Sequence, residues 1–183
     1  MTLLMAGLAL WIAAHLFKRV APGARAALGG KGRGLVALAL LVSLVLMVIG
    51  YRAAGFWPVY TPIAGMRHLN NLMMVVSIFL FGVGGTKGVL YPKLRHPMLL
   101  GVLIWALAHL LVNGDVASIV LFGTMGVWAV VEMMVINAAG PWVRPTGGRG
   151  LKGDLFNAVG TLVLVAVIGA VHSWLGYNPF TGS

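Results

Sequence analysis

The stretch that decides the fold is RHPMLLGVLIWALAHLLVNGD, residues 95–115. Its apolar run lies between a proline, which suits the first turn of a helix, and the turn-forming sequence Asn-Gly-Asp. A run of about 17 residues at 1.5 Å each approaches the thickness of a bilayer core, about 30 Å. The stretch therefore predicts a short membrane-spanning helix over about 97–113, with His109 inside it.

The composition of the whole chain extends this prediction to the rest of the protein. Of its 183 residues, 60% are hydrophobic and 9% are charged, whereas about a quarter are charged in soluble domains. So few charges cannot cover a globule with polar surface, and lipid is the expected solvent. The absence of cysteine excludes disulfides, thiolate metal sites and cysteine nucleophiles. No basic region precedes the first apolar segment, which we expect to be a retained helix.

Six apolar windows are long enough, or nearly long enough, to cross a bilayer. The connections between them are rich in Gly, Pro and charged residues, which end helices. The sequence therefore predicts an all-α integral membrane protein, a bundle of about six transmembrane helices that forms a single domain over 1–183. The windows cover about 2–17, 35–51, 69–90, 97–113, 116–138 and 155–175.

The basic residues are divided unequally between the connections. Of thirteen Lys and Arg, only Arg52 and Arg67 lie outside the first, third and fifth connections or their borders. The positive-inside rule then predicts cytoplasmic odd connections and both termini on the non-cytoplasmic side. The net charge of +10 is thus a topology signal, with contact to anionic lipid headgroups as a by-product. We expect membrane lipid as a partner and no nucleic acid.

Two histidines share a spacing with tryptophan inside apolar segments. Trp105, His109 and Asn113 recur every four residues and lie on one face of the predicted helix. Ionisable residues are costly in lipid and usually face the bundle interior, so this stripe suits a cofactor pocket. A histidine that bonds a neighbouring helix is the alternative. His15 follows Trp11 by four residues, and an interfacial histidine beside a snorkelling cation is its alternative.

The other three histidines have simpler explanations. His68 belongs to a polar cluster with Arg67 and two asparagines, for which an interhelical hydrogen-bond network is the simplest account. His96 precedes Pro97 and lies about 20 Å along the helix axis from His109, so the two cannot ligate one metal ion. His172 lies near the end of the last segment in an ordinary interface composition, and we expect no role for it.

The chain has three acidic residues, and two of them have readable roles. Asp115 follows the tight turn at Gly114 and is predicted to cap the fifth segment, with a partner in Arg67 or His68 as the alternative. Glu132 lies late in the fifth segment near the cytoplasmic side. It is expected to pair with Arg95 or another cation of that face, and proton handling is the alternative.

Three stretches together resemble the NnrU family of bacterial membrane proteins: WIAAHLFKR, YTPIAGMRHLNNLMM and LRHPMLLGVLIWALAHLLVNGDVAS. The family name is linked to nitrite and nitric oxide reduction. The family is related to 15-cis-zeta-carotene isomerase, a membrane protein with a similar RHP–G–W–AH helix. That enzyme holds haem b between two histidines and isomerises the central cis bond of a carotene.

This resemblance implies haem b, with iron ligands at His15 and His109. His15 is followed by Leu-Phe-Lys where the isomerase has Ser-Gly, which puts the isomerase activity in doubt. His15 should also lie nearer the cytoplasm than His109, so His68 with His109 is the alternative pair. Arg67 and Arg95 would hold the propionates. The remaining residues expected around the cofactor are Trp11, His96, Trp105 and Asn113.

The function implied by the resemblance is one of two, in the bacterial inner membrane. The first is a haem-dependent isomerase of a carotene-like polyene. The second is a factor that supports nitrite or nitric oxide reduction beside a respiratory or denitrification enzyme. A non-catalytic assembly factor is one alternative. A membrane S-adenosylmethionine-dependent methyltransferase is another, but its RHP-x-Y-x-G motif appears here with Leu99 in place of Tyr, and its paired glutamates reduce to Glu132.

The predicted topology can be tested directly because the chain lacks cysteine. Ala27→Cys in the first connection should react with a membrane-impermeant maleimide only after the membrane is permeabilised. Thr61→Cys in the second connection should react when the outer face alone is accessible. The opposite labelling pattern would contradict the orientation.

Overall fold

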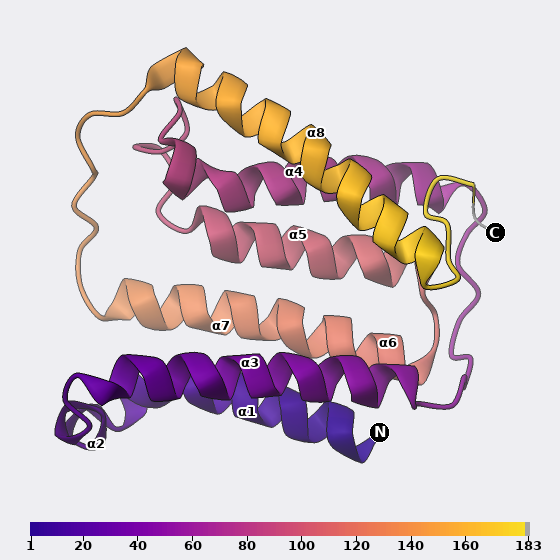
Figure 1. The fold of residues 1–183 in the computed structure, drawn as a ribbon, viewed down its shortest axis with the longest axis horizontal. Helices are drawn as coiled ribbons and strands as arrows, with labels where there is room; N and C mark the ends of the chain where they lie inside the picture. Colours follow the sequence, from indigo (N-terminus) through magenta and orange to yellow (C-terminus); the bar gives the residue numbers. More distant parts are fainter. Residues whose placement is uncertain (182–183) are drawn as a thin grey trace.

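The computed structural model describes residues 1–181, and within that range every regular element is a helix (Figure 1). The prediction of an all-α protein is therefore confirmed. The elements are α1 (Thr2–Val20), α2 (Pro22–Ala27), α3 (Lys31–Arg52), α4 (Met66–Thr86), α5 (Pro97–Val112), α6 (Val116–Ser118), the π-helical η1 (Ile119–Gly123), α7 (Thr124–Ala138) and α8 (Gly150–Trp174).

Five of these helices are long and apolar enough to cross a membrane: α1, α3, α4, α8 and a continuous helix made of α6, η1 and α7. We call that continuous helix, Val116–Ala138, the central helix. The remaining predicted span, about 97–113, corresponds to α5, an apolar helix of 16 residues. It is short because Pro97 starts it and Asn113 leaves helical geometry with φ −129° and ψ 106°. A multi-pass membrane protein follows from these helices.

The helices form a series of neighbouring pairs. α1 packs on α3 and also on α7, α7 packs on α5, α5 packs on α4, and α4 packs on α8. Figure 1 shows the long helices side by side, with α1 and α7 running in the same direction and α5 in the opposite one. The central helix thus has α1 as one neighbour and α5 as another. The helices that carry His15 and His109 therefore pack on the same partner.

The main buried cluster lies where α1, α3 and the central helix meet. Its largest members include Leu4 and Leu8 of α1, Met47 of α3, and Met125 and Trp128 of α7. Trp11 and Trp105 are half-buried and pack against its edge. The tryptophans that accompany the two histidines of interest therefore share one apolar core.

α1 and α3 approach each other at backbone distance. A Cβ added at Gly50 would lie 2.2 Å from the backbone nitrogen of Leu4, and one added at Gly7 would lie 2.8 Å from the carbonyl oxygen of Ser43. Small residues permit such close approach in membrane bundles, where van der Waals packing drives association. The two glycines therefore fix the spacing of this helix pair.

The turn between α5 and the central helix is held by hydrogen bonds. Asp115 caps α6 by accepting a 3.1 Å hydrogen bond from the Ser118 amide, which confirms the predicted capping role. The carbonyl oxygen of Gly114 accepts from the amides of Val59 and Tyr60 at 2.8 and 3.1 Å. The connection that follows α3 is thereby fastened to the start of the central helix.

Replacing Gly50 by alanine should push α1 away from α3, because the new methyl group meets backbone rather than a flexible side chain. We expect the free energy of unfolding to fall by about 1–3 kcal/mol, as for overpacked cores. The measurement is unfolding in mixed detergent micelles followed by circular dichroism.

Gly160→Ala is the matched control, because a Cβ at this position of α8 meets nothing within 4 Å. It should leave stability unchanged or raise it slightly, by up to about 1 kcal/mol from helix propensity. Equal stability of the two variants would contradict the proposed close contact.

Candidate functional site

Two stripes of side chains face each other between α1 and α7. Trp11, His15 and Arg19 follow one another at four-residue spacing on α1, and Trp128 and Glu132 do so on α7. The Trp11 and Trp128 rings lie 5.3 Å apart, and the His15 and Trp128 rings 4.6 Å apart. One turn further, Arg19 Nε lies 3.3 Å from Glu132 Oε1. The matched spacing makes this a continuous polar–aromatic seam.

The backbone of α1 fixes the orientation of the His15 imidazole. Its Nδ1 lies 3.0 Å from the carbonyl oxygen of Trp11, and its ring lies 4.3 Å from the Trp11 ring. A carbonyl accepts only, so Nδ1 carries the proton and the neutral ring has its lone pair on Nε2. An imidazole held at Nδ1 in this way presents Nε2 as a metal ligand.

Three buried polar atoms around His15 have no hydrogen-bond partner among the described residues. They are the indole nitrogens of Trp11 and Trp128 and the second carboxylate oxygen of Glu132, a residue that is 6% exposed. Buried polar groups are almost always partnered, so each exception calls for an explanation such as a bound group or water. Because these exceptions gather around His15, the seam is a candidate site for a ligand.

A cleft of about 520 Å³ opens at the same place. His15, Lys18 and Arg19 line it from α1, and Glu132 lines it from α7 together with small apolar residues. Glu132 neutralises one of the two cations, so the cleft keeps an excess positive charge. It is therefore suited to a group that carries anionic substituents.

The second tryptophan–histidine pair repeats this geometry on α5. His109 Nδ1 lies 2.9 Å from the carbonyl oxygen of Trp105, which again leaves the lone pair on Nε2. Asn113 donates to the carbonyl oxygen of His109 at 2.8 Å. The predicted stripe of Trp105, His109 and Asn113 is thus bonded within its own helix.

An aromatic ring of the central helix also covers His109. The Phe122 ring stacks on the imidazole, with centroids 4.5 Å apart and planes 26° apart. Phe122 belongs to η1, and π-helical turns inside α-helices occur frequently at functional sites because they redirect side chains. The π-helical turn therefore aims Phe122 at His109, as α7 aims Trp128 at His15.

The two imidazoles contact different parts of the central helix. Trp128 and Phe122 are six residues apart, or about 9 Å along a helix axis, and the main apolar cluster includes residues between them. His68 is exposed at the start of α4. Within residues 1–181, no group of three or more His, Asp or Glu is arranged to hold a metal ion.

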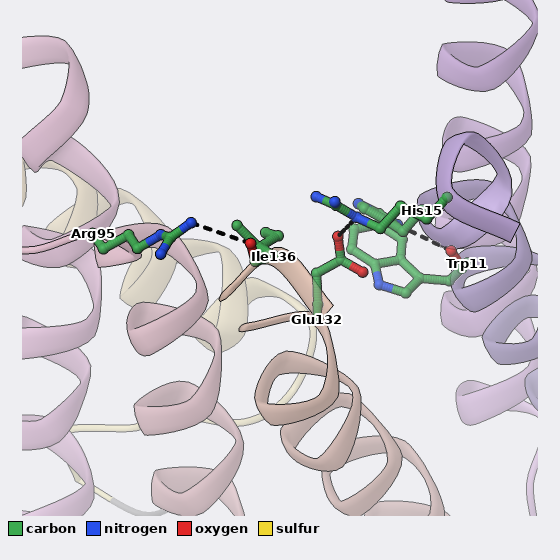
Figure 2. Close-up of polar contacts among 6 residues, drawn as sticks. Trp11, His15, Arg95, Glu132 and Ile136 are labelled. Atoms are coloured by element: carbon green, nitrogen blue, oxygen red, sulfur yellow. Dashed lines mark hydrogen bonds and ion pairs between the residues drawn. The ribbon is translucent and has the colours of Figure 1, made fainter. Parts of the chain in front are cut away.

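Three of the predicted cofactor residues hold the ends of helices. Arg95 donates from Nη2 to the carbonyl oxygens of Ile136 and Gly140 at 3.1 and 2.8 Å, on the side of α7 away from Glu132 (Figure 2). His96 Nε2 lies 2.8 Å from Asn137 Oδ1. Arg67, at the start of α4, donates to the carbonyl oxygen of Thr181 at 2.6 Å.

The structure shows which of the predicted cations pairs with Glu132. The acid pairs with a cation of its own face, as expected, but the cation is Arg19 rather than Arg95. Arg19, Trp128 and Phe122 are residues of the candidate site that the sequence analysis missed. The spacing of WAVVE, residues 128–132, repeats that of WIAAH and could have revealed Trp128. Phe122 had no such signal, because its direction depends on the π-helical turn.

A comparison with protein families gives one match that spans nearly the whole chain. The family model, described as NnrU protein, matches residues 3–179. The comparisons with curated proteins and with solved structures give no match. The matched region contains both tryptophan–histidine pairs and the whole central helix.

Breaking the Arg19–Glu132 pair should destabilise the fold, because Glu132 would stay buried without its counter-ion. Arg19→Gln is expected to lower the free energy of unfolding by about 1–3 kcal/mol, less than for a fully buried pair because the Arg19 side chain is 32% exposed. The double variant Arg19→Gln/Glu132→Gln should regain most of the loss in a double-mutant cycle.

Lys18→Gln is the control for loss of charge, because Lys18 is exposed and has no ion pair among residues 1–181. Its effect should stay within about 0.5 kcal/mol. If the double variant shows the sum of the two single losses, the pair is not coupled.

Proposed function

Since the chain belongs to the NnrU family, we propose that it is a haem b protein of the bacterial inner membrane, with iron bound by histidine Nε2 between the helices. The observation that carries the proposal is the repeated arrangement at Trp11–His15 and Trp105–His109. In both pairs the backbone engages Nδ1, which leaves Nε2 as the ligand atom.

The surroundings of His15 fit a haem in three respects. The unpartnered indole and carboxylate atoms are available to a bound group, and flat aromatic rings flank the imidazole. Lys18 and Arg19 line the adjoining cleft and suit propionates. They replace Arg67 and Arg95 in the proposal, because those side chains already donate to backbone carbonyls.

Two pairings of iron ligands are proposed. His15 with His109 rests on the family resemblance and requires α1 and α5 to bring their imidazoles to one depth. His68 with His109 places both ligands toward the predicted outer side. Both pairs include His109.

Bound haem would supply a redox-active iron, for a cis–trans isomerisation of a bound polyene or for the handling of a nitrogen oxide. The chain's own residues would orient the site. The carbonyls of Trp11 and Trp105 fix the imidazole rings, Trp128 and Phe122 cover them, and Glu132 holds Arg19 at the cleft. In the non-catalytic version of this proposal, the protein assists assembly of a respiratory or denitrification enzyme.

The contacts of the RHP motif do not favour the methyltransferase alternative. Arg95 and His96 bind the C-terminal end of α7, whereas Glu132 faces α1 and pairs with Arg19. A shared S-adenosylmethionine pocket would need these groups on one side of α7, and Figure 2 has Arg95 and Glu132 on opposite sides.

The test is an optical spectrum of the detergent-purified protein, oxidised and then reduced with dithionite. We expect a Soret band and sharp reduced α and β bands in the native chain. His109→Ala should lose them, and so should either His15→Ala or His68→Ala, which identifies the ligand pair.

His96→Ala is the matched control, because His96 is bonded to Asn137 at the end of α7 and should leave the bands unchanged. A colourless native protein from haem-replete cells would overturn the proposal. Retention of haem by His109→Ala with an unchanged spectrum would also overturn it.

A further inference from the structure

We infer that the turn joining α1 to α3 binds the phosphate of an anionic phospholipid. The turn borders a hollow of about 680 Å³, which adjoins the His15 cleft at Lys18, a residue that lines both. Lys18 of α1, Arg25 of α2 and Arg33 of α3 line it, together with Gly29 and Gly30. Three cations from three helices therefore converge on one small volume.

No acid of the chain offsets this charge. The chain has three acidic residues, and each is engaged elsewhere. Glu132 pairs with Arg19, Asp115 caps α6, and Asp154 accepts from the amide of Val89 at 3.1 Å. The hollow therefore keeps its positive charge.

The position of Arg25 is built into the backbone. Gly32 is buried, and a Cβ added there would lie 2.1 Å from Arg25 Nη1, so the guanidinium rests on the first turn of α3 where a side chain would otherwise stand. Gly29 has φ +52°, a left-handed conformation that turns the chain back toward α3. Gly29 and Gly32 thus allow the Arg25 guanidinium to lie at the hollow.

The depth of the hollow favours a lipid over free phosphate. The apolar part of α1 ends at Phe17, and that of α3 begins at Leu35. The three cations lie just beyond these limits, where phospholipid phosphates are expected. On α3, the apolar side chains that follow are exposed, including Leu35 at 49%, Leu38 at 56% and Leu41 at 58%. They provide a surface along which acyl chains can lie.

The experiment measures lipid retained by the full-length protein in native mass spectrometry. Delipidated protein is mixed with phosphatidylglycerol, with phosphatidylcholine, or with phosphatidylglycerol plus inorganic phosphate. We expect phosphatidylglycerol to be retained in preference to phosphatidylcholine and not to be displaced by phosphate. Arg25→Gln/Arg33→Gln should weaken its binding by about 30-fold. Lys93→Gln/Arg144→Gln, which removes the same charge outside the hollow, should not.

A second pair of variants keeps the net charge. Gly32→Ala should displace Arg25 and reduce phosphatidylglycerol binding, whereas Gly34→Ala, whose Cβ meets nothing within 4 Å, should not. Equal effects within either pair would overturn the inference, as would equal retention of the two lipids. Displacement by inorganic phosphate at the concentration of the lipid would assign the hollow to a free anion instead. Melting temperatures of all variants identify any that fail to fold. If a variant of one pair fails to fold, the lipid binding of the other pair tests the inference.

Discussion

Both candidate sites depend on the hydrogen bond between a histidine Nδ1 and the carbonyl oxygen four residues earlier. In the apolar part of a bundle, an imidazole without a partner would be costly, and water is absent to supply one. The bonds at Trp11–His15 and Trp105–His109 meet this need within a single helix. They also leave Nε2 without a bond to the backbone, and in the neutral ring this nitrogen carries the lone pair that a metal ligand needs.

This contact does not define a site by itself, as His172 shows. His172 Nδ1 lies 2.8 Å from the carbonyl oxygen of Ile168, in the same pattern, on the exposed side of α8. The central helix distinguishes His15 and His109, because it adds Trp128 to one imidazole and Phe122 to the other. The unpartnered buried atoms of Trp11, Trp128 and Glu132 further distinguish the α1–α7 seam from the surroundings of His109.

The helices, the cap at Asp115 and the two stripes were readable in the sequence, because each depends on residues close together in the chain. Apolar length placed the helices, although α5 is shorter than a typical span. The contacts between side chains of different helices were harder to predict from the sequence. Glu132 pairs with Arg19 because α1 and α7 run in the same direction and their side chains at four-residue spacing face each other. It does not pair with Arg95, because Arg95 lies on the other side of α7. The direction of the Phe122 side chain depends on a π-helical turn, which the sequence does not reveal. The partner of Arg67 is the carbonyl oxygen of Thr181, more than a hundred residues away in the chain.

The most direct test of the account is to locate the iron. Crystals of the native protein from haem-replete cells would be measured at the iron absorption edge for an anomalous difference map. The account predicts a peak within bonding distance of the Nε2 atom of His109, with a second imidazole Nε2 on the opposite side. A peak remote from His109 Nε2, or a haem-free structure in which protein groups occupy both the His15 and the His109 Nε2 atoms, would contradict it.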